Sequence, residues 1–429
     1  IVERDLVGGT CINYGCTPTK TMVASARVAY LARRAADYGV NAGPISVDMS
    51  RVIARKQAVV ERFRNYGTQT MQQTKNLELI FGVARFIDAK TVEVTTSADA
   101  RRLTAPKIVI NTGGRPNKPP IPGLAEVPAL DSTSVMELTE VPKHLLVLGG
   151  GFIGLEFAQM YRRFGADVTV LEGAPRLAPR DDEDVGEALQ AILREDGLRI
   201  ECNALAERVE GKAGAITLHY KQNGQVQSVR GSHLLVSVGR RPNSDDLNLA
   251  ATGVNIERAG FIIVDETLQT NVEGIYAVGD VKGGAAFTHI SYDDFRILRD
   301  RWVNKRDARL GDRLVPNTVF IDPQLAQVGV NETEARKRGL AVRVAKMGMN
   351  SVARAVETGE SRGFIKVIVD AKTGQILGCT VLGIEGGEIM SMLQIAMMGK
   401  LPYTVLKEAI FAHPTLAEGL NNIFLTLDA

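Results

Sequence analysis

The sequence feature that most constrains the fold is a glycine-rich turn between a short apolar run and a helical pattern. Residues 145–148 are typical of a buried strand, and residues 149–154 carry glycines with the spacing G-x-G-x-x-G. A helical pattern then runs to Phe164, with Gly165 at its expected end, and a second strand is expected over residues 167–171. Strand, tight turn, helix and strand in this order predict a Rossmann-like α/β domain.

Each glycine of the turn has a predicted role in holding a dinucleotide. Gly149 permits the tight turn, Gly151 lets the backbone approach a pyrophosphate, and Gly154 lets the helix pack closely on the strand. The pyrophosphate would lie at the positive end of the helix. A purely structural turn is the alternative, and the place of the turn inside a complete unit disfavours it. The predicted dinucleotide site comprises Gly149, Gly151, Phe152, Ile153, Gly154, Glu156, Glu172 and Gly239.

The acid at the end of the second strand bears on the choice of nucleotide. Glu172 follows Gly154 by 18 residues. Its carboxylate can accept hydrogen bonds from a ribose 2′-OH and would repel a 2′-phosphate. Arg176 and Arg180 lie nearby in the sequence and weaken this inference. The expected cofactor is NAD(H) in preference to NADP(H).

The rest of the chain alternates helical and strand patterns until about Leu314. Helices are predicted from Pro18 to about Asp37 and over residues 50–74, and a linker over residues 115–123. Strands are predicted at residues 79–84, 91–95, 107–111 and 274–278. Beyond Leu314, strands at 364–369 and 375–382 precede helices at about 387–400, at 403–410 and after Pro414. This order predicts two Rossmann-like α/β domains and a C-terminal α+β domain.

A close pair of cysteines, Cys11 and Cys16, is the second strong signal. Pro18 suits the first turn of a helix, which places Cys16 at a helix N-terminus, where the dipole lowers the pKa of a thiol. Lys20 lies one helical turn further along the same face. The four intervening residues, with Gly15 for flexibility, can form a loop that closes as a disulfide. Half of a zinc site is the alternative, but the sequence offers no second Cys or His pair with ligand spacing.

Composition disfavours several classes of protein. The 51 basic and 49 acidic residues are interspersed, which indicates neither a nucleic-acid surface nor a lipid surface. No apolar run reaches the ~18 residues of a membrane span, and no secretory signal is recognised. With only four cysteines, the expected compartment is the reducing cytoplasm. Cys202 and Cys379 are expected to be packing residues.

The segment Gly8–Lys20 resembles the redox-active signature of the pyridine nucleotide-disulfide oxidoreductases, and similar motifs extend over essentially the whole chain. This family includes dihydrolipoamide dehydrogenases, glutathione reductases and mercuric reductases. The resemblance implies that electrons pass from the nicotinamide to FAD, then to the disulfide, then to an acceptor. It implies that Cys16 lies beside the flavin and that Cys11 meets the substrate. It also implies that Lys20 lies near flavin N5 with Glu156 as its carboxylate partner.

The resemblance further implies an FAD site built from several segments. Residues 110–114 are similar to the second flavin motif, and residues 275–280 to the segment whose aspartate bonds the ribityl chain. Residues 286–289 match the backbone that lines the isoalloxazine, and residues 82–84 match the adenine-side turn. The implied FAD contacts are Glu3, Gly9, Thr10, Lys20, Ala84, Thr112, Gly113, Gly114, Asp280, Ala286, Phe287, Thr288 and His289. No resident metal is expected.

The family begins with a further strand, glycine turn and helix that bind the ADP half of FAD. This sequence opens with Ile1-Val2-Glu3, which resembles the end of the second strand, with Glu3 as the acid that bonds the adenosine ribose. A missing start of roughly 30 or more residues is therefore expected. We expect these 429 residues alone to hold FAD weakly or not at all.

A histidine and a glutamate, His413 and Glu418, lie five residues apart near the end of the chain. A neutral imidazole can take a proton from the Cys11 thiol, and a carboxylate can orient the ring. The resemblance implies that this pair completes the active site of a partner subunit in a homodimer. It also implies an FAD-binding domain over residues 1–118 and 243–313, an NAD(P)-binding domain over 119–242 and a dimerisation domain over 314–429.

The sequence does not identify the electron acceptor. No cysteine follows Cys379, so the C-terminal pair of mercuric reductases is not found, and the His-Pro-Thr pattern at 413–415 is shared with dihydrolipoamide dehydrogenases. Residues 287–296 resemble instead a bacterial subfamily linked to reactive chlorine resistance and copper(II) reduction. The leading interpretation is an FAD enzyme that passes electrons from NAD(P)H to a disulfide or a soft metal ion (Hg or Cu). The alternatives are dihydrolipoamide dehydrogenase and a non-catalytic NAD-binding or dimerisation fragment.

Overall fold

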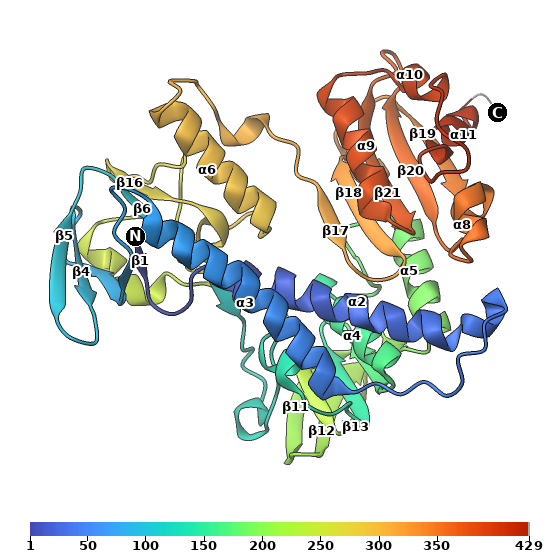
Figure 1. The fold of residues 1–429 in the computed structure, drawn as a ribbon, viewed down its shortest axis with the longest axis horizontal. Coiled ribbons are helices and arrows are strands. Elements are labelled where there is room, and N and C mark those ends of the chain that lie inside the picture. Colours follow the sequence, from blue (N-terminus) through green and yellow to red (C-terminus); the bar gives the residue numbers. More distant parts are fainter. Residues whose placement is uncertain (428–429) are drawn as a thin grey trace.

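The structure, a computed structural model, describes residues 1–427 and has three lobes that collect segments far apart in the sequence (Figure 1). The first lobe contains the N-terminus and the gold helix α6 (Thr288–Trp302). The second holds the glycine-turn unit, and the third is the orange and red C-terminal lobe. Helices α2 (Cys16–Arg33) and α3 (Met49–Gln73) run between them. The predicted helix after Pro18 therefore begins two residues earlier, at Cys16, and is followed by a 3-10 turn at Ala35–Tyr38.

The glycine-turn unit has the predicted Rossmann-like arrangement. Its four parallel strands lie in the order β10 (Arg199–Glu201), β9 (Asp167–Leu171), β8 (His144–Leu148) and β14 (His233–Val236). Helix α4 (Phe152–Phe164) connects β8 to β9, and α5 (Glu183–Glu195) precedes β10. Gly165 ends α4 with φ of 117°, a conformation that favours glycine, as predicted for this position.

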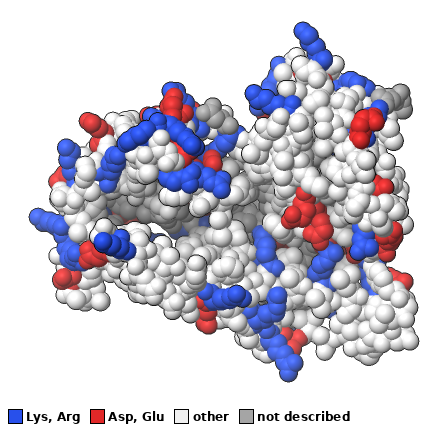
Figure 2. Space-filling view, turned by 45° about the horizontal axis from the view of Figure 1, so that its top comes forward, with Lys and Arg blue, Asp and Glu red and all other residues white. Residues whose placement is uncertain are grey.

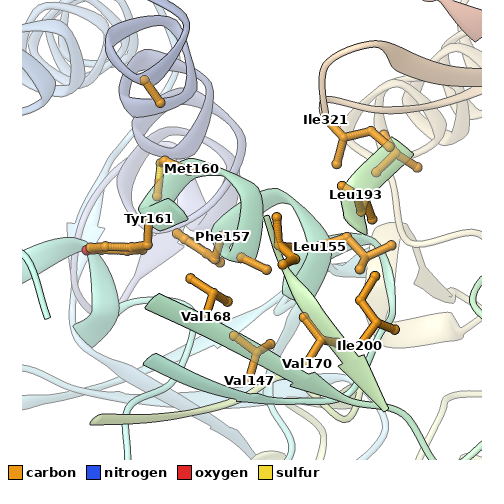
Figure 3. Packing of buried hydrophobic residues seen from close by; sticks show 14 of the residues in the cluster. Val147, Leu155, Phe157, Met160, Tyr161, Val168, Val170, Leu193, Ile200 and Ile321 are labelled. Carbon is orange, nitrogen blue, oxygen red and sulfur yellow. The ribbon is translucent and has the colours of Figure 1, made fainter. Parts of the chain in front are cut away.

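The core of this unit lies between α4 and the sheet (Figure 3). Phe157 and Tyr161 on α4 and Val147 and Val170 on the strands are all at most 1% exposed. Ile321 from the C-terminal lobe joins the same cluster. The hydrophobic core is therefore continuous across two lobes.

A second sheet in this lobe was not predicted from the sequence. Strands β11 (Leu205–Lys212), β12 (Ala215–Gln222) and β13 (Gln225–Gly231) form an antiparallel meander. The turn between β12 and β13 is Asn223-Gly224, and both residues have positive φ. An Asn-Gly pair between alternating runs is a strong hairpin signal that the sequence analysis overlooked.

The first lobe has two short parallel pairs and a small antiparallel sheet. Strand β1 (Val2–Glu3) pairs with β2 (Ile80–Phe81), and β6 (Ile108–Ile110) pairs with β16 (Ile275–Ala277). Strands β3 (Val83–Phe86), β4 (Thr91–Thr95) and β5 (Ala100–Thr104) form the antiparallel sheet. The prediction of a single strand at residues 79–84 was wrong. The segment divides at Gly82 into β2 and β3, which belong to different sheets. A Cβ at Gly82 would lie 2.7 Å from the Thr95 carbonyl oxygen, so the chain passes close to β4 at this point. Ala84, predicted in a turn, consequently lies within β3.

Part of the predicted linker is also a strand. Strand β7 (Gly114–Pro116) pairs antiparallel with β15 (Arg240–Pro242), where the chain crosses between the first and second lobes in both directions. The linker prediction for residues 115–123 was therefore wrong at its start. At this crossing the Arg240 guanidinium donates to the Gly114 carbonyl.

The C-terminal lobe is an antiparallel sheet covered by helices. Its strand order is β17 (Asn317–Val319), β18 (Gln324–Gly329), β21 (Ile376–Gly383), β20 (Phe364–Asp370) and β19 (Val342–Gly348). The predicted hairpin forms the β20–β21 pair. The helices are α7 (Glu332–Lys337), α8 (Ala353–Glu357), α9 (Gly386–Met398), α10 (Tyr403–Lys407) and α11 (Gly419–Leu425). The exact domain boundaries stay a prediction.

A buried ion cluster joins the second and third lobes. Lys366 on β20 is 3% exposed and lies 2.9 Å from Asp182, 3.1 Å from Asp184 and 2.9 Å from Glu332. The two aspartates precede or begin α5, whereas Lys366 and Glu332 belong to the C-terminal lobe. This cluster fixes the C-terminal sheet against the Rossmann-like unit.

Candidate active site

The two redox cysteines lie on consecutive short structural elements. Helix α1 (Gly9–Asn13) carries Cys11, and Cys16 is the first residue of α2. The placement of Cys16 at a helix N-terminus is thus confirmed. The prediction of a loop between the cysteines was wrong for its first half, because the first two of the four intervening residues belong to α1. Asn13 stabilises this shape, since its buried side chain donates to the carbonyls of Val7 and Gly9 at 3.0 Å each, a role that sequence reasoning missed.

The immediate neighbours give the two thiols opposite acidities. A hydrogen bond from Cys11 lowers the pKa of Cys16 to about 5, against the effect of burial and with further help from Thr288 and Lys20. The same hydrogen bond, together with burial, raises the pKa of Cys11. Thr288 Oγ1 lies 3.4 Å from Cys16 Sγ. With both thiols free, these shifts favour the thiolate at Cys16 and the proton at Cys11.

An ion pair lies on the helix face next to Cys16. Lys20 Nζ donates to Glu156 Oε2 at 2.6 Å, and the glutamate side chain is only 6% exposed. The other carboxylate oxygen accepts from the Phe320 backbone N–H at 2.8 Å. Residues of α2, α4 and the C-terminal lobe thus meet at one point, and Lys20 and Glu156 form the pair that the family resemblance implied.

The start of α6 is held against the thiols from its buried side. Thr288 is the first residue of the helix and contacts Cys16, while Asp294, one of the buried residues of α6, is fully buried. Asp294 accepts from the Gly279 N–H at 2.8 Å and pairs with Lys282 and Arg313 at 3.3 and 2.7 Å. The nearby rings of Phe287 and His289 stack with centroids 5.2 Å apart.

The residues predicted to hold FAD fit a flavin group in two respects. A Cβ at Gly9 or at Gly113 would meet nothing within 4 Å, and both glycines have positive φ, so each leaves open space beside the backbone. Asp280 follows β16, and within residues 1–427 its carboxylate has no hydrogen-bond partner. Burial raises the pKa of Asp280, and a hydrogen bond from a donor such as a sugar hydroxyl would offset the cost of burying its carboxylate.

Other predicted FAD residues have roles within the protein. Thr10 Oγ1 donates to the Gly114 carbonyl at 3.5 Å, and Thr112 Oγ1 donates to the Asn243 carbonyl at 2.7 Å. Glu3 Oε1 accepts from the Asp5 N–H at 2.9 Å. Ala286 lies just before α6. The contacts of all these residues with FAD stay a prediction.

Arg240 is a site residue that sequence reasoning missed. Its guanidinium donates to the Gly114 carbonyl and, at 3.4 Å, to Thr10 Oγ1. Burial lowers the pKa of Arg240, while the negative charges of Asp280 and Cys16 oppose that effect. The available signal was its position directly after Gly239, at the end of the Rossmann-like unit. Arg240 thus places a half-buried positive charge among the predicted flavin-binding segments.

The glycine turn has the geometry of a dinucleotide cradle. A Cβ at Gly154 would come within 2.6 Å of Ser237 Oγ and closer still to the Gly149 carbonyl oxygen, so only glycine fits there without movement. At Gly151 and Gly239, by contrast, a Cβ would meet nothing within 4 Å. Phe152 and Ile153 open α4 directly after this space. Close packing and an open backbone are the two properties that a bound pyrophosphate requires.

Glu172 is fixed beside this cradle. Its Oε2 accepts from the Gly150 N–H and its Oε1 from the Ala174 N–H, each at 2.7 Å. Arg176 points away, because its guanidinium donates to the backbone carbonyl of Asp181 at 2.7 Å. The negative charge therefore stands at the end of β9 without a partner from Arg176.

His413 and Glu418 form the predicted pair, with His413 Nδ1 2.9 Å from Glu418 Oε2. The imidazole side chain is 69% exposed. Within the described residues of one chain, no hydrogen bond joins it to either redox cysteine. The role of His413 at the redox centre of a partner subunit stays a prediction.

The molecular surface is hollowed between the first lobe and the C-terminal lobe (Figure 2). Both signs of charge occur on the face shown there. Among residues 1–427, every helix is either too short or too polar to cross a membrane.

Comparison with known proteins identifies the family. The profile of "Pyridine nucleotide-disulphide oxidoreductase" matches residues 1–294, and that of its dimerisation domain matches residues 315–423. The chain is 37% identical over 421 residues to "Probable pyridine nucleotide-disulfide oxidoreductase RclA" of Escherichia coli (strain K12), covering 98% of this chain and 91% of that protein. It is 32% identical to a mercuric reductase of Lysinibacillus sphaericus, covering 100% of this chain and 78% of that protein. It is also 32% identical to a dihydrolipoyl dehydrogenase of Geobacillus stearothermophilus, covering 97% and 88%.

Solved structures agree with this result. The structure described as a Cu(II) complex of HOCl-induced flavoprotein disulfide reductase RclA from Escherichia coli superposes with a TM-score of 0.90 at 36% identity, covering 99% of this chain and 92% of that one. The predicted α/β fold with a dimerisation domain is thereby confirmed. The family uses FAD with a pyridine nucleotide. The chain belongs to the pyridine nucleotide-disulfide oxidoreductase family and is an oxidoreductase.

Proposed function

We propose that this protein passes electrons from NADH, through FAD and the Cys11–Cys16 pair, to a small disulfide or to a soft metal ion. The observation that carries the proposal is the position of Cys16 at the N-terminus of α2, directly after the short helix α1 that carries Cys11. This setting lowers the pKa of Cys16 and raises that of Cys11. The Lys20–Glu156 pair and Thr288 lie around Cys16. A non-catalytic fragment would have no need of this arrangement.

The FAD is proposed to lie against Gly9, Gly113, Asp280 and the start of α6, where the backbone is open and an acceptor is free. When bound, FAD relays two electrons from the nicotinamide to the disulfide. Thr288 and Lys20 then hold the Cys16 sulfur in its anionic form. Arg240 adds positive charge on the same side.

Reduction of a disulfide acceptor then follows from thiol chemistry. The Cys11 sulfur attacks one acceptor sulfur, the acceptor S–S bond breaks, and a mixed disulfide forms. His413 of the partner subunit takes the Cys11 proton and returns it to the departing thiolate. The Cys16 thiolate next attacks the Cys11 sulfur and releases the second half of the acceptor as a thiolate. The acceptor has gained two electrons, and Cys11 and Cys16 have become a disulfide.

The homodimer and its shared site are part of the proposal. The dimerisation-domain match over residues 315–423 supports a dimer, and the exposed His413–Glu418 pair is free to face a partner. Few cysteines and a site that needs reduced thiols favour the cytoplasm.

The nature of the acceptor is proposed from relatives. The E. coli relative was solved with Cu(II), and other relatives are named mercuric reductase. The relatives named dihydrolipoyl dehydrogenase support dihydrolipoamide as the second candidate. The soft sulfur of Cys11, which is proposed to meet the acceptor, suits either a disulfide or a soft metal ion.

A comparison of acceptors tests the proposal. The full-length flavoprotein is assayed with NADH against glutathione disulfide, Hg(II), Cu(II) and lipoamide, and with dihydrolipoamide and NAD in the reverse direction. We expect Cys16→Ser to abolish both turnover and the long-wavelength thiolate–flavin absorbance, and Cys202→Ser, a cysteine outside the site, to keep both. Unchanged absorbance in Cys16→Ser would overturn the assignment, and fast dihydrolipoamide oxidation would select the second candidate.

A further inference from the structure

The ion pair beside the redox thiol is completed by a residue of the C-terminal lobe, Phe320. Its backbone N–H donates to Glu156 Oε1 at 2.8 Å, and Lys20 Nζ lies 4.9 Å from the centre of its ring. Lys20 and Glu156 are themselves 2.6 Å apart. One residue therefore contacts both charges of the pair, the anion through its main chain and the cation through its ring.

The segment that carries Phe320 is clamped onto α4 and α2. Gln159 exchanges two hydrogen bonds with the backbone of Asp322, at 2.8 and 2.7 Å. The Asp322 carboxylate pairs with Arg163 of α4 at 2.6 Å and with Arg27 of α2 at 2.9 Å. These are the two helices that supply Glu156 and Lys20, so the ring of Phe320 is fixed relative to both charges.

Several groups around the Cys16 sulfur set its acidity, and the charges of Lys20 and Glu156 are two of them. The charged or polar groups that face it from each surrounding element are Cys11 of α1, Lys20 of α2, Glu156 of α4, Arg240 of β15 and Thr288 of α6. Lys20 and Glu156 act in opposite directions, since the cation lowers and the anion raises the pKa of Cys16. Displacement of the ammonium alone would leave the effect of the carboxylate uncompensated.

We propose that Phe320 is a positioning residue that fixes the Lys20 ammonium beside Cys16, so that the C-terminal lobe of each chain controls the reactivity of its own redox thiol. The proposal rests on the proposed function in taking Cys16 as the reactive thiolate. The face of an aromatic ring attracts an ammonium group. The Lys20 side chain is 33% exposed, so without the ring its flexible stem can carry the charge toward solvent.

The test measures the acidity of Cys16 directly. In the full-length flavoprotein with Cys11→Ser, where the serine hydroxyl keeps a donor beside Cys16, alkylation of Cys16 by iodoacetamide is followed against pH by peptide mass spectrometry. We expect Phe320→Leu, which keeps the backbone N–H to Glu156, to raise the pH midpoint by about half a unit. Phe320→Tyr keeps an aromatic face and should restore the original midpoint.

A matched control separates this role from a merely structural one. Phe63 on α3 is also an exposed phenylalanine, 52% exposed, and Phe63→Leu should leave the midpoint unchanged. If the parent protein has a low alkylation midpoint and Phe320→Leu leaves it unchanged, Phe320 has no positioning role. The proposed function is not affected by that result. If the alkylation midpoint of Cys16 in the parent protein is that of an ordinary thiol, Cys16 is not a reactive thiolate, and both proposals fail.

Discussion

At the scale of single residues, the site works through charges whose positions are fixed by direct hydrogen bonds. Glu172 is one example, because two backbone N–H groups hold its carboxylate at the edge of the dinucleotide cradle. The sequence did not decide whether Arg176 offsets the charge of Glu172. In the structure the Arg176 guanidinium donates instead to the Asp181 carbonyl. Arg176 therefore does not pair with the Glu172 carboxylate.

We predict from this arrangement a larger kcat/KM with NADH than with NADPH. Glu172→Gln should reduce the ratio of the two values by about tenfold, since a hydrogen bond to a charged group is lost and a 2′-phosphate is no longer repelled. Steady-state kinetics with both nucleotides measure the ratio. Glu187→Gln, an exposed glutamate on α5, is the control and should leave it unchanged. A wild-type preference for NADPH would show this assignment to be wrong.

At the scale of elements, the strand–turn–helix units were predicted well because their signals are local. The spacing of glycines and apolar residues predicted β8, α4 and β9 almost to the residue, and the helix of Pro18 was predicted to within two residues at its start. The predictions failed where pairing is between distant segments. Strands β7 and β15 lie more than 120 residues apart, and neither has a local signal strong enough to predict their ladder.

Two glycines of the turn should respond differently to the same substitution. Gly154→Ala should lower stability by about 1–3 kcal/mol, because the new methyl group has no room beside Ser237 and Gly149. Gly151→Ala should leave the melting temperature nearly unchanged, since that position is open, yet weaken NADH binding where the pyrophosphate approaches. Thermal melting and NADH titration of both variants test this contrast. Equal losses of stability would contradict it.

At the scale of the whole molecule, buried charges hold the lobes in the arrangement that forms the site. Burial would raise the pKa of Asp182, but hydrogen bonds from Thr333 and Lys366 outweigh it and lower that pKa to about 2. Because the folded pKa lies below the unfolded value of 3.8, this group stabilises the fold above about pH 4. The stabilisation is lost as the pH falls from about 4 to about 2.

Removal of the central lysine should therefore destabilise the assembled lobes. We expect Lys366→Met to cost about 3 kcal/mol at neutral pH, because Asp182 and its neighbours are left as buried charges without a partner. Lys346→Met is the matched control, since Lys346 also pairs with Asp184 but is 43% exposed, and its loss should cost less than about 1 kcal/mol. Denaturant unfolding at neutral pH and near pH 3 should show the Lys366→Met deficit shrinking in acid. A deficit independent of pH would argue against this account of the cluster.

The sequence by itself determined the elements with strong local signals and the chemistry available to them. The glycine spacing, the cysteine pair and the position of Pro18 act over a few residues, so backbone geometry alone sets the dinucleotide turn and places Cys16 at a helix N-terminus. The tertiary structure decided which distant groups surround that sulfur. Thr288, Arg240 and Phe320 reach the site from three other parts of the chain, and they do so because burial of a core shared between lobes and the pairing of buried charges fix those parts together.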